Sequence, residues 1–304
     1  MKFVNRLLGN AMGKLYILGN GFDLYFGLHT KTDDFCRILK GMKSEDNEAE
    51  NLLDLFYIYG VDWSSFEDNL SKINVNLILE KNLTTPDYLS EHEYDREGVV
   101  DNMQYAVDEL EEGIQRALKR MALEANNQPL CPILQFDSTD SIISFNYTST
   151  VERVSINLKP NQFLYIHGCA LKNENLILGY PQGEKKLSEI HFDEDDDGYI
   201  LRQKTIVSRF YSSLEKEITF DKLNNFLNNC KEFDEIVVLG HSIGKSDYPY
   251  FKYLNSKYPK TKWLISYHEP KDIDKLSNNL SECNITKYAL TKSASIWNLL
   301  QDNW

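Results

Sequence analysis

Short apolar runs, each bounded by polar residues or glycine, are the main pattern along this chain of 304 residues. Most of these runs are rich in β-branched or aromatic side chains and are apolar on both faces. That pattern is typical of strands in a parallel sheet that helices cover on both sides. The predicted strands are residues 14–18, 141–145, 162–166, 175–178, 235–239 and 262–267, with a weaker candidate at 284–289.

Between the first two predicted strands lies a long segment whose hydrophobic spacing indicates helices. Apolar residues recur there at steps of three or four, which places them in one stripe along a long helix. The stripe consists of Val99, Met103, Val107, Leu110, Ile114, Leu118 and Met121. A second helix is expected to hold Trp63, Phe66, Leu70 and Ile73. Packing inside a subdomain is the favoured interpretation of the stripe, and a partner-binding coiled coil is the alternative.

The sequence therefore predicts an α/β fold with a parallel, Rossmann-like sheet and a large helical insertion. Residues 1–40 and 133–304 would form the α/β domain, and residues 41–132 the insertion. We find no internal repeats.

Four of the predicted strands are followed at once by small or polar residues. The four motifs are Gly19-Asn-Gly21, Asn146-Tyr-Thr148, His167-Gly168 and Gly240-His-Ser-Ile-Gly244. In open α/β sheets, ligands bind beyond the carboxyl ends of the strands. A glycine turn before a helix also lets backbone N–H groups approach a phosphate. If the four strands are parallel neighbours, the motifs form one site, but the sequence does not give the strand order.

Charge and cysteine content narrow the class of protein. With 33 basic and 46 acidic residues, the formal net charge is -13, which disfavours a nucleic-acid partner. The five cysteines are widely spaced and include no Cys-x-x-Cys pair, so we expect a reducing cytoplasm and no zinc site. No apolar run is long enough to span a bilayer, and no signal peptide is expected near Met1. Met12 is an alternative translation start.

Read together, these motifs resemble those of the phage abortive-infection AbiH family, and the resemblance covers most of the chain. It rests on Gly19-Asn-Gly-Phe-Asp-Leu24, Gly27-Leu28, Thr30, Asp34-Phe35, Trp63-Ser-Ser-Phe-Glu67, Phe145-Asn-Tyr-Thr148, Ile166-His-Gly168 and Leu239-Gly-His-Ser-Ile-Gly244. AbiH proteins are in turn distantly similar to the sirtuin-type (DHS-like) NAD-binding fold. The resemblance implies antiphage defence, with NAD as the substrate. A second copy of the chain and a phage-derived trigger are the candidate partners.

The resemblance also implies the roles of single residues. The catalytic residues would be Asn146, at the nicotinamide ribose, and His167, as the base. The residues expected to contact the nucleotide are Gly19, Asn20, Gly21, Phe22, Asp23, Thr148, Gly168, Gly240, Ser242 and Tyr267. Hydrolysis of NAD releases neutral nicotinamide, so the reaction needs no general acid. It needs a base for the attacking water, and a histidine with a pKa of about 6.5 suits that task.

Other functions remain open at this stage. A sirtuin-like deacylase would need a four-cysteine zinc module, which is absent. Ser242 lies in a G-x-S-x-G pattern typical of serine hydrolases, but Asp247 is too close to it, and only His268 follows. A metal-dependent nuclease would use His191 with the acidic loop 193–198, or Asp23 with Glu67; we expect that loop to be solvated instead. A non-catalytic nucleotide sensor is the last alternative.

Overall fold

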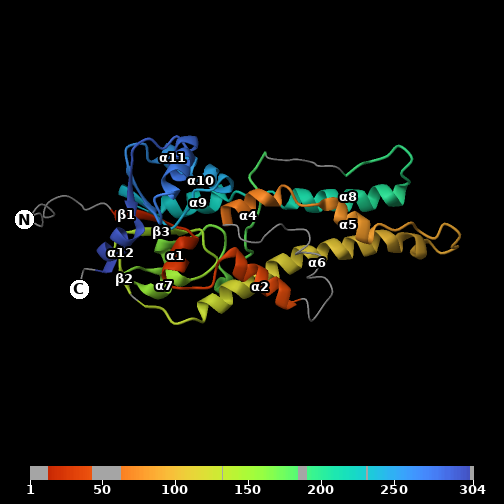
Figure 1. The fold of residues 1–304 in the computed structure, drawn as a ribbon, viewed down its shortest axis with the longest axis horizontal. Helices are drawn as coiled ribbons and strands as arrows, with labels where there is room; N and C mark the ends of the chain where they lie inside the picture. Colours follow the sequence, from red (N-terminus) through yellow and green to blue (C-terminus); the bar gives the residue numbers. More distant parts are fainter. Residues whose placement is uncertain (1–12, 43–62, 132, 184–189, 231, 302–304) are drawn as a thin grey trace, which may run out of the picture. The chain divides into compact units, whose positions relative to one another are not determined.

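The computed structural model describes residues 13–42, 63–131, 133–183, 190–230 and 232–301 (Figure 1). The chain forms two compact units. The first comprises Met1–His29, Leu123–Asn175 and Ile218–Trp304, and the second comprises Thr30–Ala122 and Leu176–Glu217. The second unit thus includes a segment from the second half of the chain, beyond the predicted insertion 41–132. We refer to the two as the sheet unit and the helical unit.

The sheet unit is built on six parallel strands in the order β5-β3-β1-β6-β7-β8. The strands are β1 (Gly13–Leu18), β3 (Ser141–Ser144), β5 (Phe163–Tyr165), β6 (Phe233–Leu239), β7 (Lys262–Tyr267) and β8 (Tyr288–Lys292). Counted along the chain, this is the 3-2-1-4-5-6 order of doubly wound nucleotide-binding sheets. The predicted parallel α/β fold is therefore confirmed. The direction of winding reverses between β1 and β6.

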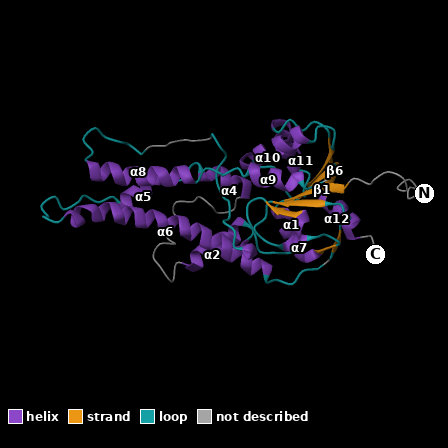
Figure 2. Ribbon diagram, turned by 180° about the vertical axis from the view of Figure 1, so that it is seen from behind, coloured by secondary structure: helices purple, strands orange, loops and turns teal. Residues whose placement is uncertain are grey.

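Helices cover both faces of this sheet, as Figures 1 and 2 show. One face packs against α9 (Phe220–Asn228), α10 (Tyr248–Lys257) and α11 (Asp272–Glu282). The other packs against α1 (Asn20–Tyr25), α7 (Thr150–Val154) and α12 (Ser293–Gln301). Successive residues of β1 alternate between the two cores, Leu15 and Ile17 facing one and Tyr16 and Leu18 the other. A buried strand needs apolar residues on both faces, so its sequence reads as a continuous apolar run.

Two of the strand predictions differ from the structure. Residues 175–178 form no strand, because the Gln115 side chain donates to the carbonyl of Leu176 (2.9 Å) and accepts from its N–H (3.3 Å). A side chain thus takes the backbone groups that a neighbouring strand would need. The last strand is β8, which begins at Tyr288 and not at residue 284. A separate pair of very short strands, β2 (Leu134–Gln135) and β4 (Ser155–Ile156), was not predicted.

The helical unit contains the long helix that the apolar stripe predicts. This helix, α6 (Glu93–Asn126), buries all the stripe residues except the half-buried Val99. The other helices are α2 (Thr32–Met42), α4 (Trp63–Leu70), α5 (Val75–Asn82) and α8 (Gly198–Ser213). Arg202 donates a hydrogen bond to Glu97 (2.8 Å), and Ser213 donates one to Glu111 (2.7 Å). Because the later residue of α8 contacts the later residue of α6, the two helices lie side by side and run in the same direction.

A fully buried ion pair joins the two chain segments of the helical unit. Lys216 Nζ lies 2.8 Å from Glu67 Oε1, and the lysine side chain has no exposed surface. Glu67 closes the Trp63-Ser-Ser-Phe-Glu67 motif, so this part of the motif has a structural use. A lysine holds that carboxylate, which removes Glu67 as a simple ligand for the magnesium ion of the nuclease alternative.

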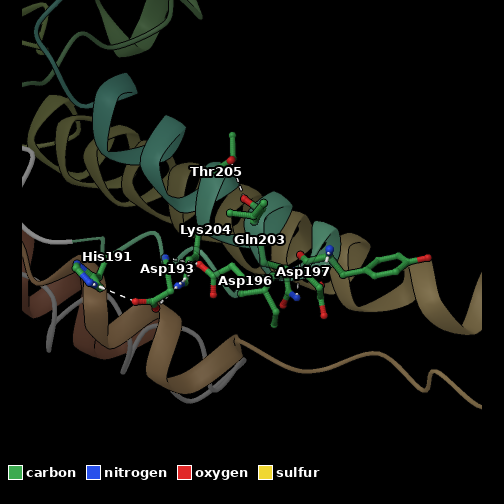
Figure 3. Close-up of polar contacts among 10 residues, drawn as sticks. His191, Asp193, Asp196, Asp197, Gln203, Lys204 and Thr205 are labelled. Atoms are coloured by element: carbon green, nitrogen blue, oxygen red, sulfur yellow. Dashed lines mark hydrogen bonds and ion pairs between the residues drawn. The ribbon is translucent and has the colours of Figure 1, made fainter.

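The acidic loop before α8 is ordered by its own carboxylates (Figure 3). Asp196 accepts a 2.6 Å hydrogen bond from Lys204, which lowers the pKa of Asp196. Asp197 caps α8 and accepts from the N–H groups of Tyr199 (2.8 Å) and Ile200 (3.0 Å). Residues 193–195 of the loop are exposed, as expected, whereas Asp196 and Asp197 are half-buried in these contacts.

Asp197→Ala is expected to lower the free energy of unfolding by about 0.5–2 kcal/mol, the usual cost of an N-cap. The two N–H groups of α8 would lose their acceptor, while the core beneath the helix stays intact. Urea unfolding checks the value. Asp195→Ala is the matched control, because Asp195 is an exposed aspartate of the same loop that lies outside the cap of α8. Equal stability of the Asp197→Ala protein and the wild type would contradict the cap.

Candidate active site at the carboxyl ends of the strands

The glycine turn after β1 packs against the turn after β6. Gly19 N–H donates to the carbonyl of Leu239 (3.0 Å), and Gly21 N–H donates to the carbonyl of Gly240 (2.8 Å). Phe22 N–H closes the turn on the carbonyl of Gly19 (2.8 Å). These three donors are therefore satisfied by backbone carbonyls. The glycines serve first to let two backbones meet at the point where the winding reverses.

The contact between the turns has no room for side chains. A Cβ on Gly21 would lie 2.7 Å from Gly240 Cα, and a Cβ on Gly240 would lie 2.5 Å from the carbonyl carbon of Gly21. Gly240 also has a φ of +63°, a region that favours glycine.

Gly240→Ala is expected to destabilise the protein by more than Gly27→Ala. Both glycines have positive φ, but nothing lies within 4 Å of a Cβ on Gly27, so that variant measures only the backbone strain of about 1 kcal/mol. Gly240→Ala adds the overlap with Gly21, about 1 kcal/mol or more. Thermal unfolding of the two variants measures the difference. Equal losses would show that the two turns do not pack as tightly as described.

A buried polar network lies beside this turn. Thr148 Oγ1 is 2.9 and 2.8 Å from the two carboxyl oxygens of Asp23, and Thr150 Oγ1 donates to Thr148 Oγ1 (2.9 Å). The Asn146 side chain donates to the carbonyl of Gly19 (3.0 Å). Burial raises the pKa of Asp23 from 3.8 to about 6, although the nearby polar side chains of Thr150, Thr148 and Asn146 act in the opposite direction.

A second buried group joins the ends of β5 and β6. His167 follows β5 directly, and its Nε2 lies 3.2 Å from Asp247 Oδ1. His241 follows β6, and its Nε2 lies 3.4 Å from Asp247 Oδ2. All three residues are buried, and the Phe145 ring packs edge-on against both imidazoles, with centroid distances of 4.9 and 4.5 Å. One carboxylate therefore lies between two histidines in an apolar surrounding.

A hydrogen bond fixes the tautomer of one of these rings. Ile243 N–H donates to His241 Nδ1 (2.9 Å), so that nitrogen is an acceptor and the ring carries a proton on Nε2, toward Asp247. The contact of His167 Nε2 with Asp247 Oδ1 is electrostatic, since the two atoms are not aligned as a hydrogen bond. A buried aspartate at this distance stabilises the protonated form of a histidine.

The structure thus brings together the ends of four neighbouring strands, β5, β3, β1 and β6. Of the predicted residues, Thr148 and Asp23 form one buried network, Asn146 contacts the glycine turn beside it, and His167 lies in the histidine–aspartate group. Both groups lie at the same edge of the sheet, since all the strands are parallel.

The remaining predicted residues differ in their surroundings. Phe22 lies in the hydrophobic core against Trp297, so its side chain is a packing residue. Gly168 has a φ of +85° and turns the chain after His167. Ser242 is exposed, while Asn20, which begins α1, and Tyr267, at the end of β7, are half-buried.

Asp247 and His241 were not assigned to the nucleotide site from the sequence. His241 lies inside the Gly240–Gly244 motif, and Asp247 follows it in the 3-10 turn Lys245–Asp247, just before α10. The sequence signal for Asp247 is a carboxylate between a buried strand and an apolar helix. This signal does not identify His167 as the partner of Asp247, because that pairing depends on the strand order.

The structure gives the two other enzyme alternatives little support. Residues 241–244 form no helix, so Ser242 does not lie on the sharp strand-to-helix turn that a nucleophilic serine needs. Among the described residues, no three His, Cys, Asp or Glu side chains are grouped so that they could hold a metal ion. In the acidic loop, Asp193 and Asp196 pair with Lys204.

Fold and site together define a doubly wound α/β protein with a buried histidine–carboxylate group at the ligand-binding edge of its sheet. The profile of the family described as Bacteriophage abortive infection AbiH matches residues 15–267, and the chain belongs to this family. Its role is accordingly in abortive infection, the phage defence that the motifs predicted. Comparison with curated proteins found no significant match. No helix in the described ranges combines the length and apolarity needed to cross a membrane.

Proposed function

We propose that this AbiH chain defends against phage by hydrolysing a nucleotide, that NAD is the substrate, and that His167 is the general base. The observation that carries the proposal is the buried pairing of His167 with Asp247, 3.2 Å apart, at the carboxyl ends of parallel strands. The strand order supports a nucleotide at this edge, since such sheets bind ligands where the winding reverses.

The proposed chemistry follows from the residue types. Water attacks C1 of the nicotinamide ribose, the bond from C1 to the nicotinamide nitrogen breaks, and nicotinamide leaves as a neutral molecule. The His167 imidazole accepts the proton of the water, and the Asp247 carboxylate stabilises the resulting imidazolium. Asn146 would hold the water or a ribose hydroxyl. The products are ADP-ribose, nicotinamide and one proton.

The glycine turn contributes less than its sequence implies. Because Gly19 and Gly21 donate to Leu239 and Gly240, their N–H groups do not face a pyrophosphate in this structure. The proposal therefore rests on the ribose side of the site, and we assign no phosphate contact to the turn. The sirtuin-like nucleotide contacts proposed for Ser242, Gly240 and Tyr267 rest on the resemblance alone.

Mass spectrometry of the purified protein incubated with NAD tests the proposal. We expect nicotinamide and ADP-ribose to accumulate with the wild type and not with His167→Ala. His92→Ala is the matched control, because His92 is exposed and lies in the helical unit. If NAD stays intact, NAD hydrolysis is rejected. If His167→Ala also keeps full phage protection in cells, the catalytic role fails and a nucleotide sensor becomes the better explanation.

A further inference from the structure

Backbone neighbours fix the position of His241, the second histidine beside Asp247. Its Nδ1 accepts a hydrogen bond from the N–H of Ile243 (2.9 Å). Gly19 packs against it, because a Cβ on Gly19 would lie 2.6 Å from His241 Cα and 2.8 Å from His241 Cβ. The Phe145 ring packs edge-on against the imidazole, with a centroid distance of 4.5 Å. The ring of His241 therefore has one position and one tautomer.

The backbone of Ile243 is strained at the point where it meets this ring. Its φ is +52°, a left-handed conformation that a β-branched residue rarely adopts, and its side chain is completely buried. Strained residues of this kind persist only where the surrounding structure imposes them, and they cluster at functional sites. The strain falls on the residue whose N–H sets the tautomer of His241.

The hydrogen bond from Ile243 decides what His241 can do toward Asp247. In a neutral imidazole one nitrogen donates and the other accepts. Nδ1 is the acceptor, so Nε2 carries the proton and lies 3.4 Å from Asp247 Oδ2. His241 can take up a second proton only on Nδ1, where the Ile243 N–H already lies. His241 is therefore suited to remain a neutral donor and unsuited to be the base of a reaction.

The carboxylate of Asp247 needs a donor of this kind. Asp247 is only 6% exposed. A buried carboxylate keeps its charge only where donors or cations replace the lost water. His241 lies at Oδ2 and His167 at Oδ1, so the two rings do not compete for one oxygen. An N–H group at Oδ2 stabilises the charge and leaves Oδ1 to face His167.

We propose that His241 is a positioning residue, which keeps Asp247 ionised and oriented toward His167 and does not itself exchange a proton. This inference rests on the proposed function and divides the work between two histidines that contact the same carboxylate. It also gives the Gly240–Gly244 motif a use besides contact with a nucleotide. The strained backbone of Ile243 belongs to this arrangement, because it holds the His241 proton on the side of Asp247.

Steady-state turnover of NAD tests the role with two amide variants of His241. The side-chain nitrogen of glutamine reaches about as far as Nε2, so His241→Gln can still donate to Asp247. The amide of asparagine reaches only about as far as Nδ1, so His241→Asn keeps an acceptor for the Ile243 N–H and loses the contact with Asp247. We expect His241→Asn to lower kcat about 100-fold, the usual cost of a misplaced group, with little change of KM. His241→Gln should keep most of the rate.

The comparison of the two variants decides between positioning and other roles. A raised KM at unchanged kcat in His241→Asn would overturn the proposal and make His241 a substrate contact. Equal losses of kcat in both variants would contradict the need for a donor at the Nε2 position. His92→Asn is the control for the change of residue type, since His92 is exposed and lies in the helical unit. Thermal unfolding shows whether each variant is folded.

A measurement without NAD, on the wild-type protein, separates this inference from the proposed function and needs no variant to fold. Nitrogen NMR distinguishes a ring nitrogen that carries a proton from one that does not. At neutral pH we expect a proton on Nε2 of His241 and none on Nδ1. A proton on Nδ1 would reject the proposed role. If His241 has the expected tautomer but the wild type leaves NAD intact, only the proposed substrate fails.

Discussion

His167→Ala is expected to abolish phage protection and to lower NAD turnover by about 10²–10⁴-fold, the contribution typical of a positioned general base. The side chain lies just beyond β5 and makes no strand pairing, so the sheet should form normally. Turnover by the purified protein and plating efficiency of phage on expressing cells measure the two effects. Circular dichroism at the same concentrations shows whether the variant is folded.

Asp247→Asn tests whether His167 needs the charge of its buried partner. It keeps the size of the side chain but removes the negative charge that stabilises a protonated His167. We expect a loss of kcat similar to that of His167→Ala, and the double variant should be little worse than either single one. Additive losses would show that Asp247 and His167 act independently. Full activity of Asp247→Asn would remove the histidine–aspartate pair from the mechanism.

The second large effect is a gain in stability, whereas the first is a loss of activity. Asp23→Asn is expected to raise the free energy of unfolding at pH 7 by about 3 kcal/mol. Burial raises the pKa of Asp23 from 3.8 to about 6, and each pKa unit corresponds to about 1.4 kcal/mol. At neutral pH the folded protein must hold this carboxylate ionised in a buried position, and the asparagine variant does not.

The pH dependence of this gain follows from linkage. Because the folded state binds the proton of Asp23 more tightly than the unfolded state does, the contribution of Asp23 is fully favourable below about pH 4 and is lost as the pH rises through about 6. The difference between Asp23→Asn and the wild type should therefore be absent near pH 4 and complete by about pH 7. Urea unfolding across this range measures it. A constant difference at all pH values would contradict the raised pKa.

Much of the fold could be predicted because the local pattern carries it. Strands such as β1 and β6 are buried on both faces, and burial on both faces requires the continuous apolar runs found in their sequences. The stripe of α6 is equally local. The strand predicted at 175–178 failed because its backbone partner is a side chain, Gln115, which lies far away in the sequence. No periodicity within the segment records such a partner.

The candidate site was predictable only in part for the same reason. Polar residues after strand ends identify His167, Asn146 and Thr148 as candidates, because all strands of a parallel sheet end at one edge. The pairing of His167 with Asp247 depends on the strand order and on the path of the loop after β6. The closure of the glycine turn by Gly240 depends on the same neighbours, so the sequence favoured a phosphate contact there.

The position of β1 in the middle of the sheet affects how this protein is made. Leu15 pairs with Ser141 on one side and with Ile236 on the other. β1 therefore cannot complete its strand pairing until much later parts of the chain have been synthesised. During translation the growing chain folds as its segments leave the ribosome. The group around Asp247 cannot form until β6 and the loop after it have emerged. Fragments released by ribosomes that stall before β6 therefore lack the histidine–aspartate group.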